Sequence, residues 1–233
     1  MKVFGIGDLH LSASGQKPMD VFGPEWAGHQ EKLERNWRAA VGPHDLVLLC
    51  GDLSWAMRLD EARPDLDFIG ALPGAKYFIQ GNHDYWFSSP GRVRAALGES
   101  MRLIRFDASV YGGVGICGVR GWLWPGHPDY KGEEDERHWK RAVARLSLSL
   151  DALRALQWDV AVSIFHFPPR GALDETELSA MIRDAGVRHC IYGHLHGPDA
   201  AKGFEGEAGG VLYRCVSADY VNFAPKLLFE FPG

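Results

Sequence analysis

The chain has 233 residues, 46% of them hydrophobic and 24% charged, and this ordinary globular composition excludes a disordered chain or a coiled coil. Its formal charge of −5, from 25 basic and 30 acidic residues, lacks the basic excess that is typical of nucleic-acid-binding proteins. We expect residues 1–233 to form a single domain. Four cysteines without a C-x-x-C pair, a short apolar N-terminal run and no bilayer-length apolar segment predict a cytoplasmic protein.

The first half of the chain alternates short apolar runs with helical patterns. Leu33, Trp37 and Val41 recur every four residues, which predicts an amphipathic helix. A second, shorter helix is predicted within 89–98, because this segment begins with Ser-Pro and contains a closing Gly. The apolar runs have the length and the flanking turn residues of buried parallel strands. These predicted strands are 3–7, 46–50 and 76–80.

The second half begins with alternating strands and then repeats the alternation of strand and helix. Gly112-Gly113 predicts a hairpin within 102–119. Four acidic residues at 133–136 precede an apolar stripe and predict the longest helix, since the helix N-terminus favours negative charge. Another helix is predicted over 175–185, and strands are predicted over 159–165, 188–192, 211–217 and 226–231. The whole order predicts an α/β fold, a four-layer α-β-β-α sandwich in which two packed mixed sheets are flanked by helices.

Residues of metal-ligating types follow the apolar runs in five short blocks. The carboxyl ends of strands are where open α/β sheets place their sites, so we expect the blocks to converge. Imidazole nitrogens combined with carboxylate and amide oxygens suit Mn, Fe, Co, Ni or Zn. Residues two apart in an extended segment point to the same side, which predicts a shared cation in the first and last blocks. The blocks are Asp8-x-His10, Gly51-Asp52, Gly81-Asn82-His83-Asp84, His166 and Gly193-His194-x-His196.

This series of blocks, which spans residues 8–196, resembles the calcineurin-like metallophosphoesterase superfamily. The resemblance implies two metal ions, Mn foremost and Fe, Zn, Co or Ni as alternatives, bridged by Asp52 and activating a hydroxide that attacks phosphorus. It also implies that His83 stabilises or protonates the leaving oxygen, with Asp84 orienting its ring. The implied ligand sets are Asp8, His10, Asp52 and His196 for one metal, and Asp52, Asn82, His166 and His194 for the other.

The residues around the blocks narrow the expected substrate. The segment after Asp52 lacks the Val-Asp-Arg-Gly run of protein serine/threonine phosphatases, and His83 replaces the Arg of lipid A-type pyrophosphatases. We therefore expect a phosphodiesterase acting on a nucleotide or another small diester. A nuclease is the enzymatic alternative, which the acidic net charge disfavours. A metal-binding interaction module without turnover is the other alternative, which the intact His83-Asp84 pair disfavours.

Aromatic and basic side chains near the blocks are candidates for substrate binding. Trp55 and Trp86 could stack on a nucleobase, although such aromatics could equally form a hydrophobic rim over the core. Arg120 could clamp a phosphate, or it could be a surface residue in a salt bridge. The long loop 11–28, which contains Trp26, predicts a lid. The histidines at 29 and 127 are expected at the ordinary surface.

Overall fold

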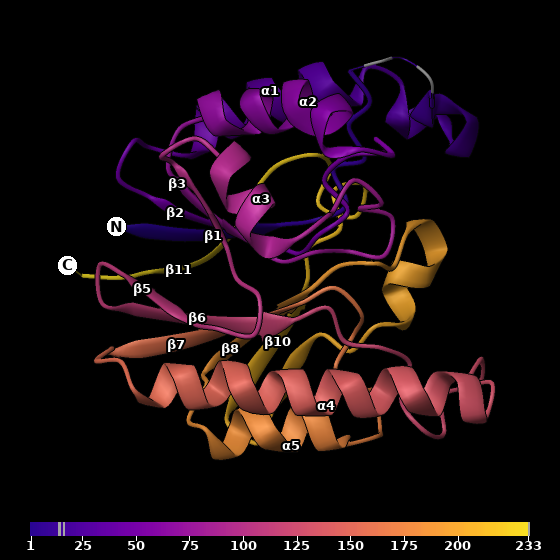
Figure 1. The fold of residues 1–233 in the computed structure, drawn as a ribbon, viewed down its shortest axis with the longest axis vertical. Coiled ribbons are helices and arrows are strands. Elements are labelled where there is room, and N and C mark those ends of the chain that lie inside the picture. The colour runs from indigo at the N-terminus through magenta and orange to yellow at the C-terminus, as the bar shows by residue number, and fades with distance from the viewer. Residues whose placement is uncertain (14, 16, 233) are drawn as a thin grey trace.

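Two β-sheets packed face to face form the centre of the molecule, and helices cover both outer faces (Figure 1). This arrangement, seen in a computed structural model that describes residues 1–13, 15 and 17–232, confirms the predicted α/β sandwich. Positions 14 and 16 belong to the predicted lid loop, and with position 233 they lie outside the described residues. Within the described part of the chain, no helix is long and apolar enough to cross a membrane.

The first sheet has five strands, and its central pairs β1–β2, β2–β3 and β3–β4 are parallel. Its outer strand β11 runs antiparallel to β1, which brings the last strand of the chain beside the first. The helices α1, α2 and α3 lie on the outer side of this sheet (Figure 1). In sheet order the strands are β11 (Lys226–Glu230), β1 (Lys2–Ile6), β2 (Leu46–Leu49), β3 (Ala75–Phe78) and β4 (Met101–Leu103). The helices are α1 (His29–Ala40), α2 (Leu59–Ala71) and α3 (Pro90–Ala96).

The second sheet has six strands, four of them parallel in the order β6-β7-β8-β10. The antiparallel strands β5 and β9 form its two edges. The helices α4 and α5 cover its outer face (Figure 1). In sheet order the strands are β5 (Ser109–Tyr111), β6 (Val114–Val119), β7 (Val160–Phe165), β8 (His189–Tyr192), β10 (Val211–Cys215) and β9 (Gly206–Ala208). The helices are α4 (Glu133–Arg154) and α5 (Glu177–Asp184), and the short 3-10 helices are η1 (Met19–Phe22), η2 (Pro24–Trp26) and η3 (Gly197–Lys202).

Strand β2 illustrates how one apolar run supports both layers of the core. Its side chains alternate between the two faces of the sheet, as in any strand. Leu46 and Leu48 belong to the cluster between the two sheets, whereas Val47 and Leu49 pack with the helices of the first sheet. A strand buried on both faces has to be apolar throughout, which explains the unbroken run in the sequence.

Helix α2 and strand β9 are among the elements that the sequence patterns did not predict. Helix α2 contains Pro64, which removes one backbone hydrogen bond and interrupts a helical pattern. The helix persists because Ala62, Leu66 and Ile69 are buried against the first sheet, and tertiary packing outweighs the local cost. Strand β9 has only three residues and pairs as an edge with β10, so it leaves almost no periodic signal.

Candidate metal centre

The five predicted blocks converge at one end of the sandwich, where the carboxyl ends of strands from both sheets meet. The blocks at 8–10, 52 and 82–84 follow β1, β2 and β3 of the first sheet, and those at 166 and 194–196 follow β7 and β8 of the second. Main-chain bonds join neighbouring blocks, as in Asp8 N to Gly51 O at 2.9 Å and Gly193 N to His166 O at 3.1 Å. Parallel strands with a common direction therefore gather the ligand types at one site.

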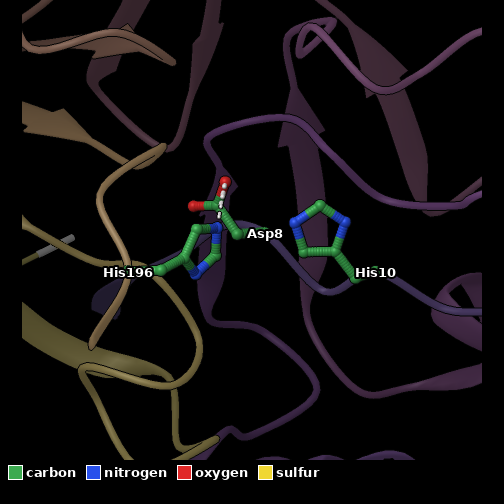
Figure 2. A group of neighbouring side chains, drawn as sticks. All are labelled: Asp8, His10 and His196. Atoms are coloured by element: carbon green, nitrogen blue, oxygen red, sulfur yellow. Dashed lines mark ion pairs between the residues drawn. The ribbon is translucent and has the colours of Figure 1, made fainter. Parts of the chain in front are cut away.

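Two groups of three side chains have ligand atoms close enough to hold a cation. The first group is Asp8, His10 and His196, and the second is Asp8, Asp52 and His166; within each, the ligand atoms lie within 4.8 Å of one another. Figure 2 shows the first group, with the Asp8 carboxylate paired to the His196 ring at 3.8 Å. The donors are imidazole nitrogens and carboxylate oxygens, the combination that suits transition metals.

The two carboxylates lie between the histidines of the site. Asp52 Oδ2 is 3.9 Å from His10 Nε2 and 3.5 Å from His166 Nε2, so Asp52 contacts one histidine of each group. Asp8 Oδ1 is 3.8 Å from His166 Nδ1 and is the residue that the two groups share. Asp8 was not expected in the second set, because the family resemblance implied that Asp52 alone is common to both ligand sets. Both carboxylates occupy the central position that a bridging ligand requires.

The contact between His166 and Asn82 places two acceptor atoms against each other. Nδ1 of His166 faces the carbonyl oxygen of Cys50 at 2.9 Å and can only donate its hydrogen there. A neutral imidazole then has no hydrogen on Nε2, which faces Asn82 Oδ1 at 2.5 Å. Burial lowers the pKa of His166 to about 3, so the ring is neutral. Both lone pairs are therefore available to the same cation.

Asp219 orients His196, and the sequence patterns did not predict this residue. Its carboxylate accepts a hydrogen bond from His196 Nδ1 at 3.0 Å and another from the Gly197 amide at 2.8 Å. Nε2 of His196 is thereby directed toward Asp8. A carboxylate behind a ligand histidine fixes its tautomer and increases its basicity. Asp219 follows β10, a strand-end position that could have suggested it, but no histidine or glycine accompanies it there.

The electrostatics of the site also fit a cation. Burial raises the pKa of Asp8 to about 7; the charge of His196 acts to lower this pKa, and that of Asp52 acts to raise it. Burial likewise raises the pKa of Asp52 to about 6. Burial lowers the pKa of His10 well below its ordinary value, and its Nδ1 is buried without a hydrogen-bond partner. Burial by itself would lower the pKa of His196, but the hydrogen bond to Asp219 and the charges of Asp8 and Asp52 raise it to about 9, so the His196 proton supplies a positive charge among the ligands. A metal ion bound by these carboxylates and imidazoles would replace that proton.

The backbone at the ligands is left-handed rather than extended. φ is 56° at Asp8, 46° at His10, 52° at Asp52 and 70° at His194, values that residues other than glycine adopt rarely. We expected Asp8 and His10 to point to one side because their segment is extended, and this reason is wrong. Main-chain hydrogen bonds to the 51–53 segment hold the turn instead. Strained backbone of this kind concentrates at functional sites.

Glycine is required before two of the ligands, because a carboxylate packs directly against the backbone there. A Cβ atom at Gly81 would collide with the carboxylate of Asp52, and one at Gly193 would collide with that of Asp8. Both carboxylates therefore rest directly on the backbone of a neighbouring block. Only glycine, which has no Cβ atom, permits so close an approach of a carboxylate to the backbone.

Asp84 does not orient the ring of His83, which corrects the expected role of this pair. Its buried carboxylate accepts hydrogen bonds from Trp86 Nε1 and from the main chain of the 52–54 and 81 segments, five in all. The ring of His83 instead meets Tyr85 Oη through Nδ1 at 3.1 Å. Asp84 thus joins the two loops that carry Asp52 and Asn82, a structural function that the G-N-H-D spacing alone does not reveal.

His194 lies outside both groups of three. Its ring centroid is 4.0 Å from that of Phe167 and 5.1 Å from that of His166, and its main-chain nitrogen donates to the Asp8 carboxylate at 3.0 and 3.1 Å. The role of the His194 ring as a ligand stays a prediction.

Of the expected substrate-binding residues, Trp86 is wrongly assigned. Only 1% of it is exposed, and its indole nitrogen is bonded to Asp84, so it belongs to the core. Trp55 lies at the site, with its ring stacked on His10 at 4.7 Å and tilted against His83 at 4.7 Å. Trp26, from the predicted lid loop, is buried against the rings of His10 and His196.

Two cavities lie near the ligand cluster. A groove of about 700 Å³ extends from His194 and His196 past Phe167 and Trp122. His127, expected at the ordinary surface, also lines this groove. Arg120, whose carbonyl oxygen accepts the His166 amide hydrogen, lines a second cavity of about 230 Å³. The guanidinium of Arg120 lies 5.2 Å from the Trp122 ring and interacts favourably with the charge of Asp52.

Comparison with known proteins identifies one family and a common fold. The family described as calcineurin-like phosphoesterase matches residues 1–198. A phosphopantetheinyl hydrolase from Mycobacterium tuberculosis superposes with a TM-score of 0.54 at 20% identity, covering 100% of this chain and 98% of that one. A protein of unknown function from Aquifex aeolicus gives a TM-score of 0.50 at 16% identity, with 97% and 94% covered. A protein from Thermus thermophilus gives a TM-score of 0.54 at 15% identity, with 83% of this chain and 81% of that one covered. The comparison with curated proteins gives no match.

Proposed function

Because the chain belongs to the calcineurin-like phosphoesterase family, and is therefore a metal-dependent phosphohydrolase with a dinuclear site, we propose that it hydrolyses a small phosphodiester such as a nucleotide derivative. The observation that supports the choice of a diester is the pair of cavities near the site, one lined by His194 and His196 and the other by Arg120. A phosphodiester carries an organic group on each side of phosphorus, whereas a monoester carries one. The groove beside His196 and the cavity beside Arg120 offer a place for each group.

Seven residues are proposed as metal ligands, and two more hold ligand histidines in place. When bound, a pair of divalent cations, with manganese the first candidate, supplies Lewis acidity for the phosphoryl oxygens and an acidified water. The protein contributes a buried donor set with fixed tautomers, in which Cys50 O holds His166 and Asp219 holds His196. The proposed ligands are Asp8, His10, Asp52, Asn82, His166, His194 and His196.

His83 is the proposed proton donor to the leaving oxygen. Its ring is half-buried beside Trp55, and its main-chain nitrogen donates to Asp52 Oδ1 at 2.8 Å, which holds it at the edge of the ligand cluster. Protonated His83 has two donors: Nδ1 can donate to Tyr85 Oη, and Nε2 remains for the leaving oxygen. Burial lowers the pKa of this ring, and the negative charge of a phosphodiester opposes that effect.

The decisive experiment compares a diester with a monoester. Metal-stripped protein is reloaded with Mn, Co, Ni or Zn and assayed with bis-p-nitrophenyl phosphate and with p-nitrophenyl phosphate. We expect turnover of the diester with at least one metal and a higher kcat/KM than for the monoester. Preference for the monoester would contradict the diester assignment, and no turnover of either substrate with any metal would favour a non-catalytic metal-binding module.

Two further substrates extend the panel. Single-stranded DNA tests the nuclease alternative, which the net charge of −5 disfavours. A phosphopantetheinyl ester is included because a phosphopantetheinyl hydrolase shares this fold. Activity on either above that on small nucleotide diesters would replace the proposed substrate class.

A further inference from the structure

A cluster of positive side chains lies beside the metal centre. The cavity that holds it, about 230 Å³ in volume, is bounded by the segments after β3 and β4, by the end of β6 and by helix α4. Two of its lining residues are continuous with the ligand blocks. Gln80 precedes Asn82 by two positions, and the carbonyl oxygen of Arg120 accepts the amide hydrogen of His166 at 3.1 Å. The cavity is therefore a neighbour of the proposed reaction centre.

The charge of this cavity is entirely positive. Arg105, Arg120, Arg141 and Arg145 line it, and the other lining residues carry no charge, including His138, whose pKa is lowered by burial and by Arg120 and Arg141. These four arginines are not among those that pair with an acidic side chain in the described part of the chain. The paired arginines are Arg38, Arg58, Arg94, Arg154 and Arg183. Four neighbouring guanidinium groups without salt-bridge partners repel one another. A bound anion would offset this repulsion.

Aromatic rings support three of these guanidinium groups. Arg105 lies 4.4 Å from the Phe87 ring, Arg145 lies 4.8 Å from the Phe106 ring, and Arg120 lies 5.2 Å from Trp122. Stacking on an aromatic face holds the plane of a guanidinium and leaves its edge donors available.

Arg105 also has a donor to spare. Its Nη1 donates to Gln80 Oε1 at 2.5 Å, whereas its buried Nε has no hydrogen-bond partner. A buried donor without a partner is costly and indicates a missing acceptor.

We propose that this cavity, here called the arginine pocket, binds a second phosphate group carried by the substrate, separate from the phosphodiester that is cleaved. The proposal rests on the proposed phosphodiesterase function and names a substrate class, diesters with a terminal phosphate. A terminal phosphate carries nearly two negative charges and three acceptor oxygens, which match several guanidinium forks better than a single carboxylate does.

The test compares two substrates that differ only in the second phosphate. They are thymidine 5′-(p-nitrophenyl phosphate) with a free 3′-hydroxyl and the same compound with a 3′-phosphate, assayed with the metal-loaded protein. We expect the 3′-phosphate to raise kcat/KM by about tenfold or more, chiefly through a lower KM, as for one or more charge-assisted hydrogen bonds. Equal kcat/KM values for the two substrates would overturn the proposal. Because the 3′-hydroxyl substrate alone tests diester hydrolysis, the two proposals can fail separately.

Variants of helix α4 locate the effect. Arg145→Gln and the more exposed Arg141→Gln should each reduce the preference for the 3′-phosphate by about tenfold. Arg137→Gln is the matched control, since Arg137 is exposed on the same helix and does not line the cavity. An equal loss of preference in Arg137→Gln would attribute the effect to general charge and overturn the assignment. Competition by inorganic phosphate without any preference for the 3′-phosphate would identify the pocket as a site for the free ion and would also overturn it.

Discussion

Nε2 of His166 and Oδ1 of Asn82 lie 2.5 Å apart, and neither atom has a hydrogen to share. The Cys50 carbonyl, 2.9 Å from Nδ1, accepts the one ring hydrogen of the neutral imidazole. Two acceptors this close repel each other unless both bind the same cation, so this pair fits a shared metal ion.

Asn82→Ala should reduce the metal content of the protein from two ions to about one per chain, because one oxygen of the second set is lost. The measurement is elemental analysis after equilibration with Mn and gel filtration. Asn36→Ala is the control, since its amide donates to the carbonyls of Asn222 and Phe223 instead of facing a histidine. Two ions retained by Asn82→Ala would remove Asn82 from the ligand set.

Asp219→Asn should weaken metal binding by about 10- to 100-fold, because His196 keeps its hydrogen-bond partner but loses the negative charge behind the ring. Titration calorimetry with Mn measures this affinity. Asp199→Asn is a matched control, since Asp199 is exposed and pairs with Lys202. Unchanged affinity in Asp219→Asn would show that the carboxylate does not tune the ligand.

His83→Ala should lower kcat for diesters with alkyl leaving groups by about 10²- to 10⁴-fold. The loss should be much smaller for p-nitrophenyl esters, because p-nitrophenolate leaves without being protonated. Tyr85→Phe should produce a weaker version of the same pattern, since it removes the partner of Nδ1. The measurement is kcat for the two leaving groups at a fixed metal concentration. An equal loss with both would argue against proton donation by His83.

Asp84→Ala should destabilise the metal-free protein by about 3–5 kcal/mol, because it leaves several buried donors and two adjoining loops without their common acceptor. Urea denaturation measures the free energy of unfolding. Asp174→Ala, at an exposed position, should change it by less than about 0.5 kcal/mol. A catalytic defect in Asp84→Ala with full stability would restore a direct role beside His83.

Lys76 predicts a pH dependence of stability that is independent of the metal centre. Its fully buried ammonium donates to the carbonyls of Gly70 and Leu72 at the end of α2, and burial lowers its pKa to about 8, against 10.5 for a free lysine. Between these two values the unfolded chain binds more protons than the folded one, so this residue's contribution makes the free energy of unfolding rise with pH from about 8 to 10.5.

Lys76→Met should abolish that rise, so that the free energy of unfolding of the variant, relative to that of the wild type, decreases as the pH increases from about 8 to 10.5. Urea denaturation at several pH values between 7 and 10.5 measures this difference. Lys140→Met, at an exposed lysine that pairs with Glu136, should leave the pH profile unchanged. Parallel profiles for wild type and Lys76→Met would show that the ammonium is not desolvated.

Local sequence determined the fold class and most of the ligand chemistry. A strand that is buried on both faces has to be apolar. The chain needs glycine where it leaves such a strand next to a packed carboxylate. The apolar runs and the glycines before Asp52, Asn82 and His194 are therefore visible in the sequence. Ser89 likewise begins α3 as expected, accepting from the Arg92 amide. These features depend on neighbours within a few residues, which is the range that periodicity and capping patterns cover.

Tertiary structure alone decided how the side chains are used. Asp84 bonds across to the 52–54 loop and Asp219 reaches back 23 residues to His196, although each could have capped a helix or lined a surface. Arg105 and Arg145 meet at one cavity because β4 and α4 converge there. Such contacts are fixed by the packing of two sheets and not by local preference, so residue type and spacing identify the metal ligands but not their supporting partners or the anion pocket beside them.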